Sequence, residues 1–280
     1  MTNDLSIPAS VLIIAQNAEK HLRRCLDSLK AFKEVVIIDG GSKDKTEEIA
    51  KTYPNVKFVK NPWPGFIPQR NVSIDNASYE WCFMIDSDEA ATPELVEEIR
   101  KVVEKNDRKI AMWRVVRTEY FEGAAIEYGH GRSDYQERLF LRDRTRYTGG
   151  NHHLHLIDGI DLGKQPHLMA DFPRHVRVLH DPDYDLDAMI TKMPRFSMLI
   201  GSEKFNKGRR VSAPEVIFSF VWTAIRMSWR SRKMGKRGIV LAFMKAYSDS
   251  LAKLYIYDLQ NFRNIKPVSY THLTLPTKAS

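Results

Sequence analysis

The stretch Trp81-Cys82-Phe83-Met84-Ile85-Asp86-Ser87-Asp88 places five apolar residues directly before two carboxylates. Such an apolar run is typical of a strand that is buried on both faces of a sheet. Carboxylates that follow the strand lie at its carboxyl end, where open α/β sheets bind their ligands. The alternative is a solvated acidic turn that caps the next helix, and an isolated Asp-x-Asp pair does not separate the two interpretations.

Short apolar runs and helical patterns alternate on both sides of this stretch. Strands are predicted over residues 10–14, 35–38 and 56–59, with a helix after each. Thr92 and Pro93 supply the N-cap and first position of the helix that follows the acids. This alternation indicates βαβ units and an α/β fold with a mostly parallel sheet. Further strands are predicted at 110–116 and 138–141, and a helical region begins near Leu186.

The strand-end acids suit a metal-bound diphosphate. Two carboxylates one residue apart can place one side chain on a divalent cation and the other on a ribose hydroxyl, and hard oxygen ligands favour Mg²⁺ or Mn²⁺. Asp39 ends the earlier apolar run and is followed by Gly40 and Gly41, which allow close approach of a base. Its carboxylate can accept the imide N–H of uracil. The competing interpretation is that Asp39 or Ser42 caps the next helix.

The positive charge of the chain is concentrated near its C-terminal end. The formal net charge is +8, and residues 201–240 hold ten Lys or Arg against two acids, so the remainder is balanced. A predicted helix over 214–237 would carry four cations on one face: Arg226, Arg230, Lys233 and Arg237. With apolar residues elsewhere, it suits an interfacial helix on an anionic membrane surface. The alternatives are a packed helix with a solvated cationic rim, and nucleic-acid binding, for which no motif is found.

Four segments, in this order, resemble the inverting family 2 glycosyltransferases of the GT-A fold. They are SVLIIAQNAEKHLRRCLDSL (10–29), EVVIIDGGSKDKT (34–46), PGFIPQRNVSI (64–74) and EWCFMIDSDEAATPEL (80–95). Within the family the closest resemblance is to the lipopolysaccharide-core type of glucosyltransferase, with weaker matches at DYQERLFLRD (134–143) and VLHDPDYDLDAMITKMPRFS (178–197). The resemblance implies a Rossmann-like, mostly parallel mixed sheet flanked by helices.

The resemblance also implies roles for individual residues. Asp88 would ligate Mg²⁺ or Mn²⁺, Asp86 would bind the ribose and Asp39 the base. The full set of expected nucleotide contacts is Asn17, Asp39, Gln69, Arg70, Asn71 and Asp86. His180 is a candidate for a further metal or phosphate contact, with a histidine at the core edge as the alternative.

An inverting transfer needs a base that deprotonates the acceptor hydroxyl. Asp134 and Glu137 precede the strand at 138–141 and are the candidates, and Asp134 best matches the family's acidic position upstream of an R-L-F run. An exposed turn is the alternative. His153 and His155 have no cysteine or third clear ligand nearby to complete a zinc site. We assign His153 to the acceptor pocket.

These observations predict a GT-A domain over residues 8–185, a helical, basic extension over 186–266, and a tail, 267–280, that is non-native or disordered. The expected activity is transfer of a hexose from a nucleotide-sugar, a UDP-hexose, to a saccharide or lipid-linked acceptor in cell-envelope glycan synthesis. The expected location is the inner face of the membrane, as a peripheral cytoplasmic protein that binds no nucleic acid. A nucleotidyltransferase should carry a Gly-rich basic loop after the first strand, where residues 15–18 read AQNA. A non-catalytic protein that binds membranes or nucleic acid is the other alternative.

Overall fold

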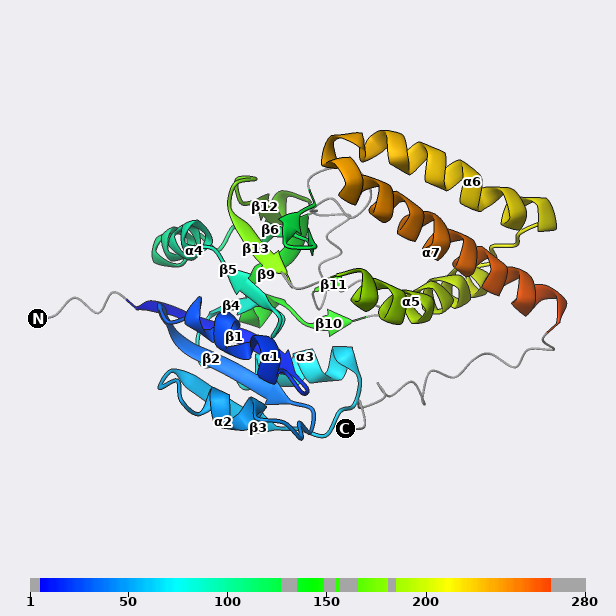
Figure 1. Ribbon diagram of the computed structural model, residues 1–280. Coiled ribbons are helices and arrows are strands. Elements are labelled where there is room, and N and C mark those ends of the chain that lie inside the picture. The colour runs from blue at the N-terminus through cyan, green and yellow to red at the C-terminus, as the bar shows by residue number, and fades with distance from the viewer. Residues whose placement is uncertain (1–5, 127–134, 149–154, 157–165, 181–184, 263–280) are drawn as a thin grey trace, which may run out of the picture. The chain divides into compact units, whose positions relative to one another are not determined.

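The computed structural model describes residues 6–126, 135–148, 155–156, 166–180 and 185–262. They form two compact units, one made of the described residues up to 180 and one made of residues 185–262 (Figure 1). Three features predicted from the sequence lie outside the described residues: Asp134, His153 and the tail at 267–280.

The first unit is built on one mixed sheet. Its strands run in the order β3-β2-β1-β4-β9-β6-β13-β5, and β12 pairs with β6. The four strands at one side are parallel: β1 (Ile7–Ala15), β2 (Phe32–Asp39), β3 (Val56–Lys60) and β4 (Trp81–Met84). The others are β5 (Glu89–Ala91), β6 (Met112–Thr118), β9 (Tyr135–Leu141), β12 (Met169–Asp171) and β13 (Arg177–His180). Strand β9 runs antiparallel to both β4 and β6, which makes the sheet mixed. The predicted α/β fold is confirmed.

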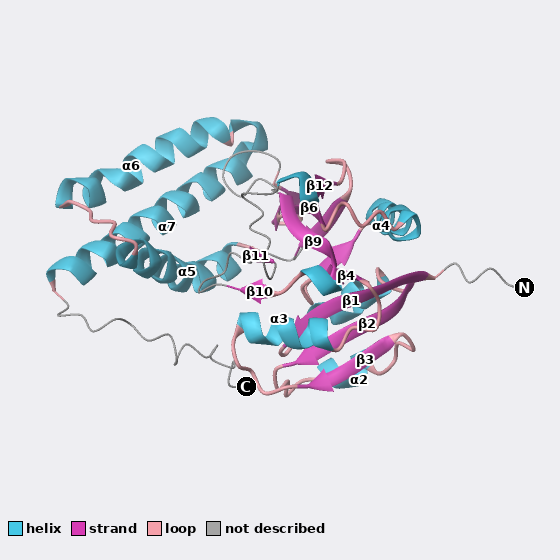
Figure 2. Cartoon of the chain, turned by 180° about the vertical axis from the view of Figure 1, so that it is seen from behind, coloured by secondary structure: helices cyan, strands magenta, loops and turns pink. Residues whose placement is uncertain are grey.

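Helices cover the sheet on both faces (Figure 2). They are α1 (Glu19–Asp27), α2 (Thr46–Ala50), α3 (Phe66–Asp75) and α4 (Pro93–Lys105). On β1, Val11 and Ile13 pack in one buried cluster with residues of α1 and α4, while Leu12 and Ile14 pack in a second cluster with Ile74 of α3. This two-sided burial explains why the central strands read as continuous apolar runs.

Short elements complete the first unit. Two small two-stranded sheets pair β7 (Tyr120–Phe121) with β8 (Ala124–Ala125) and β10 (Tyr147–Thr148) with β11 (His155–Leu156). Two 3-10 helices are η1 (Arg142–Arg144) and η2 (Pro166–Leu168). The predicted start of α4 is confirmed, because the Thr92 hydroxyl accepts a hydrogen bond from the Leu95 backbone N–H at 3.3 Å and Pro93 is the first helical residue.

The second unit consists of α5 (Leu186–Asn206), α6 (Ala213–Arg230), the 3-10 helix η3 (Arg232–Met234) and α7 (Gly235–Asn261). Helix α7 lies between α5 and α6 and packs on both (Figure 1). The helices approach closely where side chains are small: a Cβ on Gly201 of α5 would lie 2.8 Å from the Ala252 carbonyl oxygen of α7. Within the part of the chain that the structure describes, no helix is both long and apolar enough to cross a membrane.

The prediction of one helix over 214–237 was wrong. Helix α6 ends at Arg230, and α7 starts at Gly235, whose φ of +58° suits glycine. The chain then folds back so tightly that a Cβ on Gly238 would lie 2.2 Å from the Ser231 carbonyl oxygen. Consequently Arg226 and the cations beyond residue 231 belong to different elements and do not share one helical face.

Candidate active site

Asp86 lies just beyond β4, between two arginines. Its Oδ1 accepts a hydrogen bond from Nη2 of Arg70 on α3 at 3.0 Å, and its Oδ2 lies 3.8 Å from Nη2 of Arg138 on β9. Burial opposes ionisation, but Arg138 and Arg70 outweigh it and hold the pKa of Asp86 below its usual range. Asp86 is therefore a carboxylate that is fixed in place and has acceptor capacity left for a ligand hydroxyl.

The buried ion pair beneath Asp86 was not predicted from the sequence. Glu89 is fully buried and Arg138 is 4% exposed, and their charged groups lie 2.7 Å apart. The other Glu89 oxygen accepts the backbone N–H of Asp86 at 2.9 Å, and Arg117 of β6 lies 3.7 Å away. Burial and the neighbouring Asp86 hold the pKa of Glu89 above its usual range despite Arg138. By accepting the Asp86 backbone N–H, the pair thus fixes the turn that carries Asp86 and Asp88.

The arginines around these acids retain unused donors. The Nε atoms of Arg70, Arg117 and Arg138 are buried and have no hydrogen-bond partner among the described residues. Buried donors are normally satisfied. This cluster therefore has more charged N–H donors than its own carboxylates bind. The excess of donors favours an anionic ligand.

Asp88 lies in the turn between β4 and β5, directly before Glu89, which pairs with His180 where β5 runs antiparallel to β13. His180 Nε2 lies 3.5 Å from Asp88 Oδ2, and His180 Nδ1 lies 2.6 Å from Oε2 of Glu119, just beyond β6. Burial disfavours the charged ring, but the bonds to Asp88 and Glu119 outweigh it and raise the pKa of His180 to about 10. Glu119, which the sequence analysis missed, orients the ring so that Nε2 faces Asp88.

This arrangement fits a divalent cation that is held jointly with a substrate. A carboxylate on the far nitrogen of a ligating histidine is a common feature of protein metal sites. Among the described residues no group of three or more His, Cys, Asp or Glu is placed to hold an ion. Mg²⁺ is commonly bound through one or two carboxylates and completes its shell with phosphate oxygens and water. Asp88 matches that pattern, and His180 would add a nitrogen ligand once a bound cation displaces the proton that Asp88 and Glu119 stabilise.

Asp39 and Asn17 organise the loops after β2 and β1. Asp39 is 3% exposed, and its carboxylate accepts hydrogen bonds from the backbone N–H groups of Gly41 and Ser42, both at 3.0 Å, and from the Ser42 hydroxyl at 2.5 Å. Asn17 Oδ1 accepts from the Lys43 backbone N–H at 2.8 Å. Asp39 therefore closes its own loop and does not cap α2, which begins at Thr46.

The three candidates on α3 serve different purposes in the structure. Gln69 is fully buried and exchanges hydrogen bonds with Asn61. Asn71 bonds to both backbone groups of Tyr147, at 2.9 and 3.0 Å. Within the described residues, Arg70 is the member of this trio whose side chain bonds to Asp86, and its guanidinium lies over the Tyr147 ring at 5.4 Å.

Of the two base candidates, Glu137 is described. It is a partly exposed residue of β9 that precedes Arg138. The register of β9 against β6 shifts between Glu137 and Leu139, which places Arg138 in a β-bulge. Asp134 lies outside the described residues.

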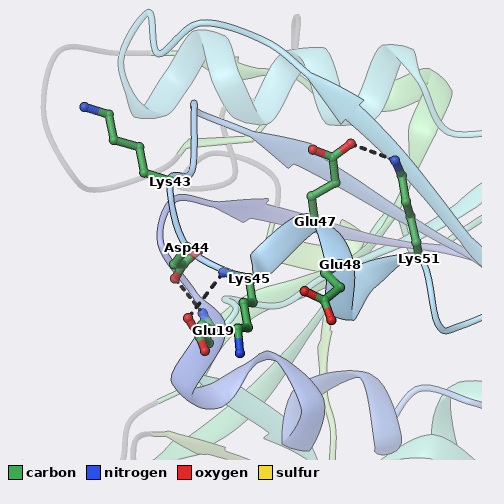
Figure 3. A pocket seen from close by; sticks show the side chains of 7 residues that line it. All are labelled: Glu19, Lys43, Asp44, Lys45, Glu47, Glu48 and Lys51. Carbon is green, nitrogen blue, oxygen red and sulfur yellow. Dashed lines mark hydrogen bonds and ion pairs between the residues drawn. The ribbon is translucent and has the colours of Figure 1, made fainter.

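A surface hollow elsewhere in the first unit contains none of the strand-end acids. It is lined by Glu19, Lys43, Asp44, Lys45, Glu47, Glu48 and Lys51 (Figure 3). Its groups bond to one another: Asp44 accepts the Glu19 backbone N–H at 3.0 Å, and Lys51 pairs with Glu47 at 2.8 Å. Four acids and three lysines nearly cancel in charge, so the hollow has no clear preference for a charged ligand.

Residues 10–158 match the model of one protein family, described as Glycosyl transferase family 2. The chain belongs to this family. The resemblance inferred from the motifs is confirmed, and the chain is a glycosyltransferase. This decides against the nucleotidyltransferase and the non-catalytic binding protein as interpretations of its activity.

The chain is also similar to individual proteins. The chain is 29% identical over 257 residues to a lipopolysaccharide core biosynthesis glycosyltransferase, LpsC, of Rhizobium meliloti, and the match covers 90% of this chain and 92% of that protein. It is 32% identical over 146 residues to the prophage-derived glycosyltransferase SunS of Bacillus subtilis, covering 50% of this chain and 33% of SunS. The crystal structure of S. aureus TarS 1–349 aligns with 93% of each chain, at 14% identity and a TM-score of 0.44.

Proposed function

We propose that this glycosyltransferase moves a hexosyl group from a UDP-hexose to a saccharide or lipid-linked acceptor in cell-envelope glycan synthesis. The observation that carries the proposal is the convergence of Asp86 and Asp88, in the turn between β4 and β5, with His180 at the end of β13. The match to LpsC over nearly the whole chain supports the class of pathway.

The donor contacts follow from this geometry. Asp86 would accept a ribose hydroxyl, and the arginine donors around it would face the diphosphate. A carboxylate has about four lone-pair positions. Asp39 accepts from three donors of its own loop through four contacts, because the Ser42 N–H is shared between both oxygens, and the imide N–H of a uracil would replace the longest of these contacts, at 3.3 Å.

Asp88 and His180 would hold Mg²⁺ or Mn²⁺, which supplies charge neutralisation for the departing diphosphate. The acceptor oxygen bonds to the anomeric carbon as the bond from that carbon to the UDP oxygen breaks, and configuration inverts. Asp134 is our candidate for the carboxylate that takes the acceptor's proton, with Glu137 as the alternative base, and His153 would line the acceptor pocket.

The test is hydrolysis of a panel of UDP- and GDP-sugars with Mg²⁺ or Mn²⁺ by the wild-type chain and by Asp88→Asn. Loss of an electrostatic contact to the leaving group should lower turnover by about 10²-fold or more. Glu48→Gln, at the unrelated surface hollow, is the matched control and should stay at wild-type rate. Metal-dependent hydrolysis at the wild-type rate by Asp88→Asn would refute the assignment of Asp88 as a metal ligand.

A lipid-linked acceptor places the enzyme at the membrane. We propose peripheral association with the inner face, supported by the ten cations among residues 201–240. An assay that compares the same acceptor saccharide free in solution and lipid-linked in vesicles tests this part. Equal rates at equal saccharide concentration would contradict it.

A further inference from the structure

Helix α6 presents its large apolar side chains outward. Six of them are 55–67% exposed. They are Ile217, Phe218, Val221, Trp222, Ile225 and Trp229. The side chains that α6 buries are Ser219, Thr223, Ala224 and Met227. In an ordinary surface helix the large apolar residues form the buried face, so α6 has the opposite arrangement.

The outward residues form one continuous stripe. Positions 217, 221, 225 and 229 recur every four residues, and 218 and 222 lie beside them, so all six share one side of the helix. The opposite side packs on α7, where the Ser219 and Ser250 hydroxyls lie 3.0 Å apart. Soluble monomers rarely leave so large an apolar patch without a partner. The stripe therefore indicates a binding surface.

The charge around the stripe specifies the partner's chemistry. Residues 216–248 contain seven Lys or Arg and no Asp or Glu. Arg226 and Arg230 are exposed at the C-terminal half of α6. Arg232 follows in η3, with its guanidinium 4.5 Å from the Trp229 ring centroid. An apolar stripe bordered by cations and tryptophans is the composition of helices that lie in the headgroup region of anionic membranes.

We propose that the outward face of α6 is a docking surface for an anionic lipid bilayer, with the stripe inserted at the boundary between headgroups and acyl chains. The helix would lie in the membrane plane, and the cations near Arg230 would contact lipid phosphates. A second copy of the chain fits this face less well, because a symmetric contact would bring identical cations together. The purpose of docking, access to a lipid-linked acceptor, rests on the proposed function. The docking itself does not.

The experiment measures partitioning of the full chain into vesicles of phosphatidylethanolamine with phosphatidylglycerol, and into pure phosphatidylcholine vesicles. Trp222→Ser combined with Trp229→Ser should lower partitioning into the anionic vesicles at least about tenfold. Ile190→Ser combined with Phe196→Ser, two residues of α5 that are 52% and 56% exposed, is the matched control and should change it less than about twofold.

Charge variants test the electrostatic part. Arg226→Gln and Arg230→Gln should each weaken binding to anionic vesicles about fivefold and reduce its salt dependence, with little change on phosphatidylcholine. Three results would each overturn the proposal: no vesicle binding by the folded wild type, unchanged binding by the double tryptophan variant, or a lipid-free dimer that this variant dissociates. Donor hydrolysis in lipid-free buffer is measured in parallel, and its absence in the wild type would count against the proposed function and not against docking.

Discussion

Replacing Arg138 with Met should destabilise the first unit severely, because it leaves a buried carboxylate without its main partner. Arg138 donates to Glu89 at 2.7 Å, and both side chains are almost completely buried. Removing one member of a buried ion pair typically costs about 3–5 kcal/mol. Arg117, at 3.7 Å from Glu89, offsets part of that loss, so we expect a cost of about 3 kcal/mol.

The assay is urea unfolding followed by tryptophan fluorescence in a background with Trp222→Phe and Trp229→Phe. The remaining tryptophans, Trp63, Trp81 and Trp113, all belong to the first unit. The free energy of unfolding comes from the midpoint and slope of the transition.

A double variant separates the loss of the pair from the loss of the arginine's packing. Glu89→Gln combined with Arg138→Met removes both charges, and the uncompensated charge disappears with them. Its cost should be smaller than the sum of the two single costs, by about 1–3 kcal/mol. A cost below about 1 kcal/mol for Arg138→Met, or strict additivity in the double variant, would refute the reasoning.

Three further predictions follow from the contacts. Glu119→Gln removes the charge that orients His180, so Mn²⁺ affinity measured by calorimetry with UDP present should fall about 10–100-fold, and unchanged affinity would contradict the arrangement. Burial opposes ionisation of Glu34, but hydrogen bonds from two serines outweigh it and hold its pKa below 4.5. The stabilisation that ionised Glu34 contributes to folding is therefore present above pH 4.5 and is lost as the pH falls through the lowered pKa. Glu34→Gln should have a lower free energy of unfolding than the wild type at neutral pH but not at low pH. A difference in free energy that does not change with pH would contradict this. Burial raises the pKa of Cys25, and that of Cys82 to about 12, so neither thiol should react with Ellman's reagent in the native protein.

The positions of the strand-end acids could be predicted because buried parallel strands leave a strong sequence signal. The runs that end at Asp39 and Asp86 became β2 and β4, and both strands pair with β1 in parallel register. Their carboxyl ends therefore meet at one edge of the sheet. The order of those strands in the sheet was not readable from the runs themselves.

The partners of those acids could not be predicted because they arrive through non-local pairing. Arg138 on β9 reaches Glu89 because one sheet contains both β9, which pairs with β4 and β6, and β5, which pairs with β13. Glu119 reaches His180 because β13 pairs with β6. These contacts join residues about 50 to 60 positions apart, for which local periodicity carries no information. A charged residue in the run Arg138–Leu141 was the available signal for a buried ion pair.

On helix α6, sequence periodicity alone could not predict which face is buried. An apolar stripe at helical spacing establishes that two faces differ but does not say which one is buried. On α6 the answer depends on how closely the backbone approaches α7. The contact through Ser219 and Ser250 leaves room only for small side chains, so the large ones face outward. Leu in place of Ser219 would push α6 away from α7. Ser in place of Trp222 would remove an exposed apolar side chain that makes little contribution to packing within the unit. Stability should therefore depend on the small residues of this helix, and membrane binding on the large ones.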